Sequence, residues 1–158
     1  MNIALLIPCF NNLEGLHKSL ASIHEEDVCV VVYVINDGSD FRLEPEDFYL
    51  YGFSVVVIEN KVNLGIEASL RLGVEQIDND GFEFFSRLDC GDTQYKNRIS
   101  IQVSFLRGNL DHAIVGSYAN AIDPSSNKVV FKLKNPLASE AVASRLLGTC
   151  CLCHPTIT

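Results

Sequence analysis

The chain has 158 residues, of which 47% are hydrophobic, a length and composition typical of one globular domain that buries a sizeable core. Twelve Lys and Arg against twenty Asp and Glu give a net charge of −8, which argues against nucleic acid and anionic membranes as partners, because both require a positive surface. No apolar stretch approaches the roughly 20 residues that cross a bilayer, and the N-terminus lacks the positive region of a signal peptide, so a cytoplasmic protein is expected.

The first hundred residues alternate between strand-like and helix-like segments. Apolar, β-branched runs predict strands over residues 3–7, 28–35, 53–58 and 82–88. Residues 41–52 are mixed and acidic and predict a loop with a helical turn. Helices are predicted after a cap at Asn11 or Asn12, after residues 63–65, and up to the stop at residues 107–109. The apolar stripe expected for the second helix consists of Ile66, Leu70, Val74 and Ile77.

The last third of the chain predicts a fifth strand over residues 113–118 and a helix over residues 137–147. Between them, an antiparallel ribbon is expected near residues 112–134, with two strands joined by a turn at residues 124–127 (Pro-Ser-Ser-Asn). The six cysteines do not suggest a disulfide framework. Residues 150–154 (Cys-Cys-Leu-Cys-His) match no common zinc-finger spacing.

Alternation of strand and helix predicts an α/β fold in a single domain, residues 1–158. The expected architecture is a mostly parallel, Rossmann-like sheet with helices on both faces and right-handed crossovers. The segment after the first strand reads Pro-Cys-Phe-Asn-Asn, which is not the Gly-x-Gly-x-x-Gly fingerprint of dinucleotide binding, and a phosphate-loop lysine motif is absent. A nicotinamide dehydrogenase and an ordinary nucleotide hydrolase are therefore disfavoured.

Residues 85–92 (Phe-Ser-Arg-Leu-Asp-Cys-Gly-Asp) bring two carboxylates to the end of a buried strand. In open α/β sheets, ligands bind in the crevice outside the carboxyl ends of the strands. There, Asp89 and Asp92 can hold a divalent cation through hard oxygen ligands, and the cation can neutralise a diphosphate. The alternative is a turn in which both carboxylates only satisfy local backbone donors.

Five segments in a fixed order cover essentially the whole chain: residues 7–12 (Ile-Pro-Cys-Phe-Asn-Asn), 34–40 (Val-Ile-Asn-Asp-Gly-Ser-Asp), 63–65 (Asn-Leu-Gly), 87–92 with Asn97-Arg98, and 154–156 (His-Pro-Thr). Together they resemble the family 2 glycosyltransferases with the GT-A fold, including the family's Asp-Asp-Gly-Ser turn and Asp-x-Asp segment. The resemblance implies transfer of a sugar from a nucleotide-diphosphate donor to a hydroxyl acceptor, with inversion at the anomeric carbon.

The resemblance also implies a donor-binding set: Pro8, Phe10, Asn11, Asp37, Asn63, Gly65, Arg87, Asp89 and Cys90. An aromatic ring at Phe10 can stack on a nucleobase, and the alternative is a core phenylalanine that caps the strand. Asp37 is expected to accept a hydrogen bond from a ring nitrogen of uracil or thymine, which favours a UDP- or TDP-sugar. It can at the same time be a turn residue that bonds its own backbone.

Mn²⁺ or Mg²⁺ is the implied cofactor, and Asp89 and Asp92 are its implied ligands. The chain departs from the family pattern at Gly91, which stands where the metal-binding aspartate is usual. Asp92 is present one residue further on, so the sequence leaves open which of the two carboxylates binds the metal. Arg98 matches the family arginine and is expected to brace the acidic turn through a bidentate pair, or otherwise to form a surface salt bridge.

The catalytic base is not identified in the sequence. In the family it lies past the His-Pro-Thr segment, and this chain ends at Thr158, so the resemblance implies the N-terminal, donor-binding part of a longer enzyme. Asp123 is an alternative base without a spacing argument. The implied acceptor is a saccharide or a lipid-linked acceptor, as in surface polysaccharide or glycolipid synthesis. Peripheral membrane association would come through the missing C-terminal part.

Two other functions compete with catalytic sugar transfer. Gly91 and the absent base favour a non-catalytic module that binds a nucleotide-sugar. A nucleotidyltransferase on a similar sheet would need a Gly-rich, basic loop after the first strand, and residues 8–12 are neither. We therefore expect a glycosyltransferase, with the binding module as the alternative.

Overall fold

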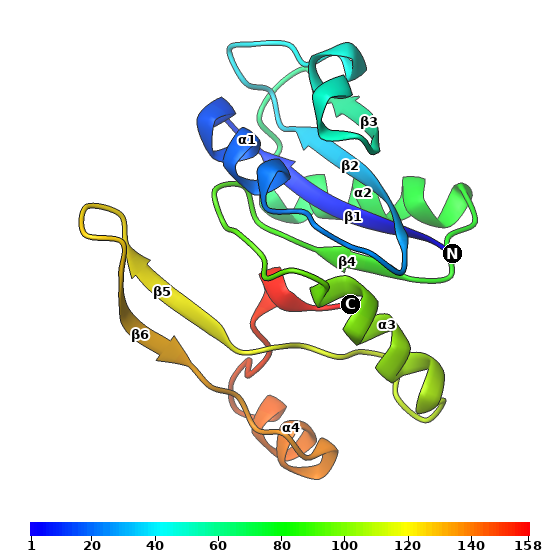
Figure 1. The fold of residues 1–158 in the computed structure, drawn as a ribbon, viewed down its shortest axis with the longest axis vertical. Helices are drawn as coiled ribbons and strands as arrows, with labels where there is room; N and C mark the ends of the chain where they lie inside the picture. The colour runs from blue at the N-terminus through cyan, green and yellow to red at the C-terminus, as the bar shows by residue number, and fades with distance from the viewer.

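The computed structural model describes residues 1–158 and shows an α/β fold in which a twisted sheet lies between helices (Figure 1). In chain order the elements are β1 (Asn2–Cys9), α1 (Leu13–Ala21), β2 (Cys29–Asn36), η1 (Pro45–Tyr51), β3 (Ser54–Glu59), α2 (Ile66–Asn79), β4 (Phe85–Arg87), α3 (Arg98–Gly108), β5 (Ala119–Asp123), β6 (Lys128–Leu133), α4 (Ser139–Leu146) and η2 (His154–Thr156). The predicted strands and helices of the first hundred residues are all present.

The main sheet has four parallel strands in the order β3-β2-β1-β4. β1 pairs with β2 along its whole length, from Asn2 opposite Cys29 to Cys9 opposite Asn36. β4 is short and pairs with β1 only from Ala4 to Leu6. Because all four strands run the same way, their carboxyl ends meet at one edge, which confirms the mostly parallel sheet expected from the sequence.

Two apolar layers cover the two faces of this sheet. The larger one joins alternate residues of β1 and β2 with side chains of α1, α3 and η1, such as Leu16, Ile99 and Phe48. The smaller one joins the other face of both strands with Ile77 of α2. β1 is buried on both faces, as expected for a central strand of a parallel sheet. Helices therefore lie on both faces, as predicted.

The face that α2 buries agrees only in part with the predicted stripe. Ile77 is buried and Leu70 packs against the same apolar layer, as predicted, but Ile66 and Val74 are 55% and 37% exposed. Ser69 and Gly73 are buried in their place. A Cβ atom on Gly73 would lie 2.3 Å from Leu6 Cδ1, so the helix approaches the sheet on its small residues. Because α2 packs closely against the sheet through Ser69 and Gly73, Ile66 and Val74 are turned partly toward solvent. The spacing of apolar residues in the sequence could not indicate this rotation of the helix.

The predicted fifth strand over residues 113–118 is absent from the structure. That segment is extended, but its ladder is limited to two backbone hydrogen bonds between Val115 and Thr158, with N···O distances of 3.0 and 2.9 Å. The backbone N–H of Arg87 in turn donates to Ile157 O at 3.0 Å, so the last residues lie between β4 and the 113–118 segment.

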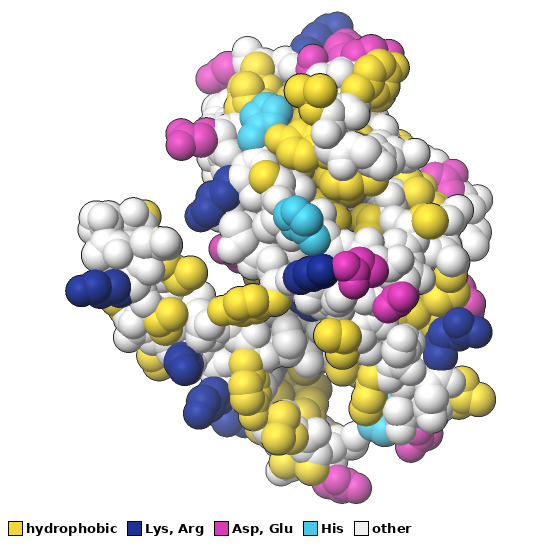
Figure 2. All heavy atoms as spheres, viewed as in Figure 1, with side chains coloured by type: hydrophobic (Ala, Val, Ile, Leu, Met, Phe, Trp, Pro, Cys, Tyr) yellow, Lys and Arg dark blue, Asp and Glu magenta, His cyan; other side chains and the backbone are white.

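The antiparallel ribbon is confirmed as β5 paired with β6, with a bulge next to Ile122. Ribbon and α4 extend away from the sheet (Figure 1). No residue between 119 and 148 is buried. Basic side chains and exposed apolar side chains lie next to one another on this part of the surface, as Figure 2 shows. The helices include none with the length and apolar character that crossing a bilayer requires.

Candidate functional site

The loops that carry the sequence motifs converge at the carboxyl edge of the sheet. The Asp37 backbone N–H donates to Cys9 O at 2.8 Å and joins the ends of β1 and β2. The Asn60 backbone N–H donates to Asn36 O at 2.9 Å and joins the ends of β2 and β3. β4 neighbours β1 and ends directly before the acidic turn, residues 89–92. Residues from four separate motifs therefore share one edge.

Pro8 and Phe10 take different positions in this edge. Pro8 is buried within β1, opposite Ile35 of β2. Phe10 follows the strand and is 49% exposed, so its ring does not serve as a core residue that caps the strand. An exposed aromatic side chain directly after a central strand gives the edge an apolar surface.

Asn11 fastens the loop after β1 to the loop after β2. Its backbone N–H donates to Ser39 Oγ at 2.9 Å, and its side-chain Oδ1 accepts from the Asp40 backbone N–H at 2.8 Å. Asn11 has φ = 47°, in the left-handed region that Asn tolerates better than most residues. Asn11 thus fixes the position of the loop that carries Phe10 relative to the loop that carries Asp37.

Asp37 is 4% exposed, and its carboxylate accepts three hydrogen bonds. Oδ1 accepts from Asn60 Nδ2 at 2.7 Å and from the Leu64 backbone N–H at 2.9 Å, and Oδ2 accepts from the Gly65 backbone N–H at 2.9 Å. Burial raises the pKa of Asp37, but these hydrogen bonds outweigh burial and hold the pKa below its usual value. Asp37 is therefore ionised at neutral pH and organises residues 60–65.

Residues 60–65 depend on glycine at two positions. Gly65 precedes α2 with φ = 86°, and its N–H also lies 3.1 Å from Asn63 Oδ1. Gly38 has φ = 71°, and a Cβ atom there would lie 2.3 Å from the backbone carbon of Val62. The loop after β2 and the loop after β3 are consequently in direct backbone contact, which only glycine permits at position 38.

Asn60 is a site residue that the sequence analysis missed. Its amide is the closest donor to Asp37, and it also lies 3.3 Å from Ser69 Oγ. The available signal was its position, since it directly follows β3 at the edge where Asn36 ends the neighbouring strand and Asp37 follows it.

The acidic turn contains one paired and one unpaired carboxylate. Asp89 Oδ1 accepts from Arg87 Nε at 3.0 Å, an ion pair at the end of β4. The Asp92 carboxylate has no such partner, and partial burial together with the negative charge of Asp89 raises the pKa of Asp92, although Lys18 opposes the shift. The charge of Asp89 is therefore close enough to Asp92 to disfavour the ionised form of Asp92.

A side chain at position 91 would point toward α1. Its φ is 96°, and a Cβ atom would lie 3.4 Å from Asn12 Nδ2 and 4.0 Å from the Cα atom of Gly15. The Gly91 backbone N–H donates to Ser19 Oγ at 2.9 Å and lies 3.2 Å from Gly15 O. A side chain at position 91 would therefore begin against α1 and in a strained conformation.

Ser19 is a second residue that the sequence analysis missed. It is fully buried on α1; its hydroxyl accepts from Gly91 N–H and donates to Asp92 O at 2.8 Å. The hydroxyl therefore bridges two peptide groups of the acidic turn. A serine among the apolar residues of a helix face was the signal in the sequence, since a buried hydroxyl requires partners.

Arg98 does not pair with the acidic turn, so both predicted roles were wrong. Its guanidinium donates to Gln94 Oε1 at 2.8 Å, to Gln102 Oε1 at 3.2 Å and to Arg87 O at 3.2 Å. Burial lowers the pKa of Arg98 to about 10, although Glu25 opposes the shift. Arg98 therefore braces β4 through its backbone carbonyl, while Arg87 makes the ion pair with Asp89.

Cys90 places its sulfur beside the end of β1. Cys90 Sγ lies 3.6 Å from Cys9 Sγ and 3.3 Å from Asn12 O. Both cysteines are free. The hydrogen bond from the Cys90 thiol lowers the pKa of Cys9. The same hydrogen bond, the burial of Cys90 and the negative charges of Asp89 and Asp92 raise the pKa of Cys90.

A divalent cation fits the acidic turn only with help from a substrate. No group of three or more His, Cys, Asp and Glu side chains is arranged as a metal site. Two neighbouring carboxylates are nevertheless the donor set that Mg²⁺ uses when phosphate oxygens and water complete its coordination. Asp89 and Asp92 are accordingly the residues that would hold such a cation.

The His-Pro-Thr segment returns to this side of the sheet. Gln102 Nε2 donates to Thr156 O at 2.7 Å, and Thr158 Oγ1 lies 2.8 Å from Gln102 Oε1. Asp123, considered as a base, lies in the ribbon turn instead, where its carboxylate accepts from Ser125 and Ser126. Asp123 thus has a turn-forming role.

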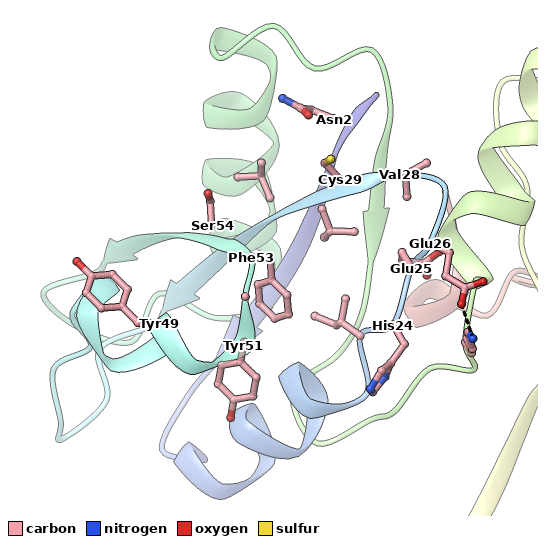
Figure 3. Close-up of a pocket in the computed structure, with 15 residues that line it drawn as sticks. Asn2, His24, Glu25, Glu26, Val28, Cys29, Tyr49, Tyr51, Phe53 and Ser54 are labelled. Atoms are coloured by element: carbon pink, nitrogen blue, oxygen red, sulfur yellow. Dashed lines mark ion pairs between the residues drawn. The ribbon is translucent and has the colours of Figure 1, made fainter.

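A hollow of ≈ 860 Å³ lies at the opposite, amino edge of the sheet (Figure 3). It is lined by the first residues of three strands, by Tyr51 and Phe53 with ring centroids 5.7 Å apart, and by Glu26, which pairs with Lys96 at 2.6 Å. None of the motif residues lines this hollow. Its size alone therefore does not make it the functional site.

Comparisons with known proteins identify the family. The profile described as "Glycosyl transferase family 2" matches residues 4–155. An uncharacterized glycosyltransferase of Rickettsia felis is 30% identical over 122 residues, which cover 73% of this chain and 19% of that protein. An uncharacterized glycosyltransferase of Haemophilus influenzae is 26% identical over 155 residues, which cover 92% of this chain and 47% of that protein. The chain thus spans less than half the length of these relatives.

Solved structures agree on the fold. The crystal structure of Staphylococcus aureus TarS residues 1–349 in complex with UDP superposes with a TM-score of 0.55 at 19% identity, over 70% of this chain and 33% of that one. A second crystal structure of TarS gives a TM-score of 0.54 at 18% identity, over 68% and 20% of the two chains. These matches confirm the GT-A architecture, and with the profile match over nearly the whole sequence they show that the chain belongs to glycosyl transferase family 2.

Proposed function

We propose that this domain binds a UDP- or TDP-sugar at the carboxyl edge of the sheet and supports transfer of the sugar to a hydroxyl acceptor, saccharide or lipid-linked, with inversion. The synthesis of surface polysaccharides or glycolipids is the setting that the family resemblance favours. The observation that carries the proposal is the Asp37 carboxylate, which is ionised, nearly buried and one acceptor position short of full hydrogen bonding.

The acceptor count of Asp37 matches a uracil or thymine ring. Each carboxylate oxygen has two lone pairs; Oδ1 accepts from Asn60 and Leu64, and Oδ2 accepts from Gly65, while the nearby Ser69 hydroxyl also favours the ionised form. The remaining lone pair of Oδ2 can accept from the N3–H group that uracil and thymine share. A base without an N–H at that position would leave a buried acceptor unpaired, at a cost of about 1–3 kcal/mol. The UDP bound to TarS is in keeping with this choice.

The rest of the donor would follow the edge from Phe10 to the acidic turn. The half-exposed ring of Phe10 offers a stacking surface for the base. Gly65, at the N-terminus of α2, and Asn63 lie beside Asp37. On the β4 side, Arg87 holds the Asp89 carboxylate in place, at the end where the diphosphate would lie. A bound Mg²⁺ or Mn²⁺ would supply charge neutralisation of the departing diphosphate.

Thermal unfolding with UDP tests the donor site. UDP with Mn²⁺ is expected to raise the melting temperature, because a ligand that binds only the folded state stabilises it by mass action. Asp37→Ala and Asp89→Ala are expected to abolish the rise. Asp111→Ala is the matched control, since Asp111 is exposed in a loop after α3 and its carboxylate bonds only His112. Absence of any shift at saturating UDP and Mn²⁺ in the unaltered protein would disprove the donor site.

The second candidate is a module that binds the donor without catalysing transfer. Gly91 favours the binding module, because it stands where the family usually has a metal-binding aspartate. A side chain at this position would contact Asn12 and Gly15 at the start of α1 instead of entering an open site. Release of UDP from UDP-sugars, with and without acceptor, separates the two. Release that depends on Asp89 supports the transferase, and tight donor binding without release supports the module.

A further inference from the structure

Cys9 is the last residue of β1, and Cys90 lies in the acidic turn that follows the neighbouring strand β4. β1 and β4 pair with Ala4 opposite Phe85 and Leu6 opposite Arg87. The turn after β4 brings the Cys90 sulfur to 3.6 Å from the Cys9 sulfur. A disulfide has an S–S bond of about 2.05 Å, so the two sulfur atoms need only a small movement of the turn to reach bonding distance.

The two cysteines also differ in access to solvent. Cys9 is 2% exposed, whereas Cys90 is partly exposed in the acidic turn. A small oxidant can therefore reach the Cys90 sulfur, and the only other thiol in contact with it is Cys9 directly beneath. Cys29 is far from this pair in the fold, because it begins β2 at the amino edge of the sheet.

We propose that Cys9 and Cys90 are a modification site, which a peroxide converts to an intramolecular disulfide. In the first step one thiol of the pair gives up its proton and its sulfur attacks one oxygen of hydrogen peroxide; the O–O bond breaks, and the products are a sulfenic acid and one water. In the second step the sulfur of the other cysteine attacks the sulfenic sulfur, the S–O bond breaks, and the hydroxyl leaves as a second water with the proton of that second thiol. The two thiols are oxidised, and the peroxide is reduced.

The disulfide changes the position of the acidic turn. Closing 3.6 Å to a bond of about 2.05 Å draws Cys90 toward β1, and Asp89 precedes it directly. Binding constellations tolerate displacements of only about 0.5 Å. On the premise of the proposed donor site, the oxidised protein therefore binds UDP with Mn²⁺ at least about tenfold more weakly than the reduced protein.

Mass spectrometry tests the bond independently of donor binding. Hydrogen peroxide is expected to lower the mass of the intact protein by about 2 Da, for two hydrogens lost per disulfide, and digestion without reductant is expected to yield the peptide that joins Cys9 to Cys90. Cys29→Ser retains this product, whereas Cys9→Ser and Cys90→Ser lose it. Peptides that join other cysteines, or sulfinic acid on unlinked Cys90, would overturn the proposal. Because mapping uses the unaltered protein, misfolding of a variant does not affect the conclusion.

Titration with UDP and Mn²⁺ before and after oxidation tests the consequence. We expect weaker binding after oxidation and full recovery with dithiothreitol. Equal affinity of the reduced and the disulfide-bonded protein for UDP would overturn the inference that the disulfide weakens donor binding. If the reduced protein does not bind UDP at all, the proposed function fails, and the linked peptide still decides on the modification site.

Discussion

Residues 1–108 and residues 119–148 differ in how they are held in place. The first region contains both apolar layers and a central strand without an exposed residue after Asn2. The second region has paired strands and a helix, but no residue in it is buried. All proposed donor-binding residues belong to the first region. The comparison teaches that the well-packed sheet, and not the ribbon, provides the rigidity that a binding site requires.

The two regions also differ in charge. Residues 119–148 carry four Lys and Arg and two Asp and Glu, a net charge of +2, whereas the remaining residues carry eight and eighteen, a net charge of −10. The net charge of −8 for the whole chain therefore hides a basic segment. The argument against anionic partners applies to the surface around the sheet and does not extend to the ribbon and α4.

Limited proteolysis is expected to separate the regions most strongly. Lys132 in β6 and Arg71 in α2 both have exposed side chains, but only Arg71 lies in an element packed on the core. Cleavage requires local opening, so trypsin should cut after Lys132 about a hundredfold faster than after Arg71. Peptide mass mapping over time measures both rates. Similar rates at the two sites would show that the ribbon is as stable as the sheet.

Core truncation should give the next largest contrast. Leu5 is fully buried in β1, whereas Val130 in β6 is 66% exposed. Leu5→Ala should lower the free energy of unfolding by about 2–5 kcal/mol, because it removes buried methyl groups and leaves a cavity. Val130→Ala should change it by less than about 0.5 kcal/mol. Urea unfolding monitored by circular dichroism provides both values, and a large loss for Val130→Ala would mean that the ribbon contributes to the cooperative core.

Removal of Ser19 tests the acidic turn more narrowly. Ser19→Ala leaves the Gly91 N–H and Asp92 O without their shared partner and should cost about 1–3 kcal/mol of stability. Ser125→Ala removes an exposed hydroxyl bonded to Asp123 and should cost about 0.5 kcal/mol or less. Urea unfolding and UDP titration with Mn²⁺ are the measurements. Unchanged UDP affinity in Ser19→Ala would show that the turn keeps its shape without this hydroxyl.

The sequence predicted those parts of the structure in which local pattern and burial agree. The Val-rich run of β2 and the apolar run of β1 specify buried parallel strands, and Asn12 caps α1 through its Oδ1, 2.9 Å from the Gly15 backbone N. The predicted strand at residues 113–118 has the same apolar character. It is not a regular strand, because its backbone ladder consists only of the two hydrogen bonds between Val115 and Thr158.

Site residues could be predicted only as positions and not as contacts. The resemblance indicated which loops matter, and parallel pairing brought them to one edge. It could not indicate that Asn60 would orient Asp37, or that Arg87 and not Arg98 would pair with Asp89, because these contacts join segments far apart in the sequence or depend on side-chain direction. Whether the placed residues bind donor stays a prediction.

Acid unfolding should give the smallest effect and concerns Asp37. Its folded pKa is lowered, so the ionised carboxylate contributes stability that is fully present above the unfolded pKa of about 3.9. That contribution is lost as the pH falls through the lower folded pKa. Asp37→Asn, which does not ionise, should show a shallower loss of stability below about pH 4 than the unaltered protein. Urea unfolding at several pH values measures how steeply the free energy of unfolding falls with pH in each protein. The same pH dependence in both proteins would contradict the stabilising role of the ionised Asp37 carboxylate.

Gly91 limits how the acidic turn can be redesigned. Its backbone N–H is committed to Ser19, and a new side chain would start beside Asn12 in a conformation that L-residues disfavour. Reinstating the family's aspartate by a single substitution would therefore add a carboxylate in the wrong direction and strain the turn that holds Asp89 and Asp92. The residue at position 91 is therefore coupled through this hydrogen bond to a hydroxyl on a different element, so a redesign of the turn has to treat positions 19 and 91 together.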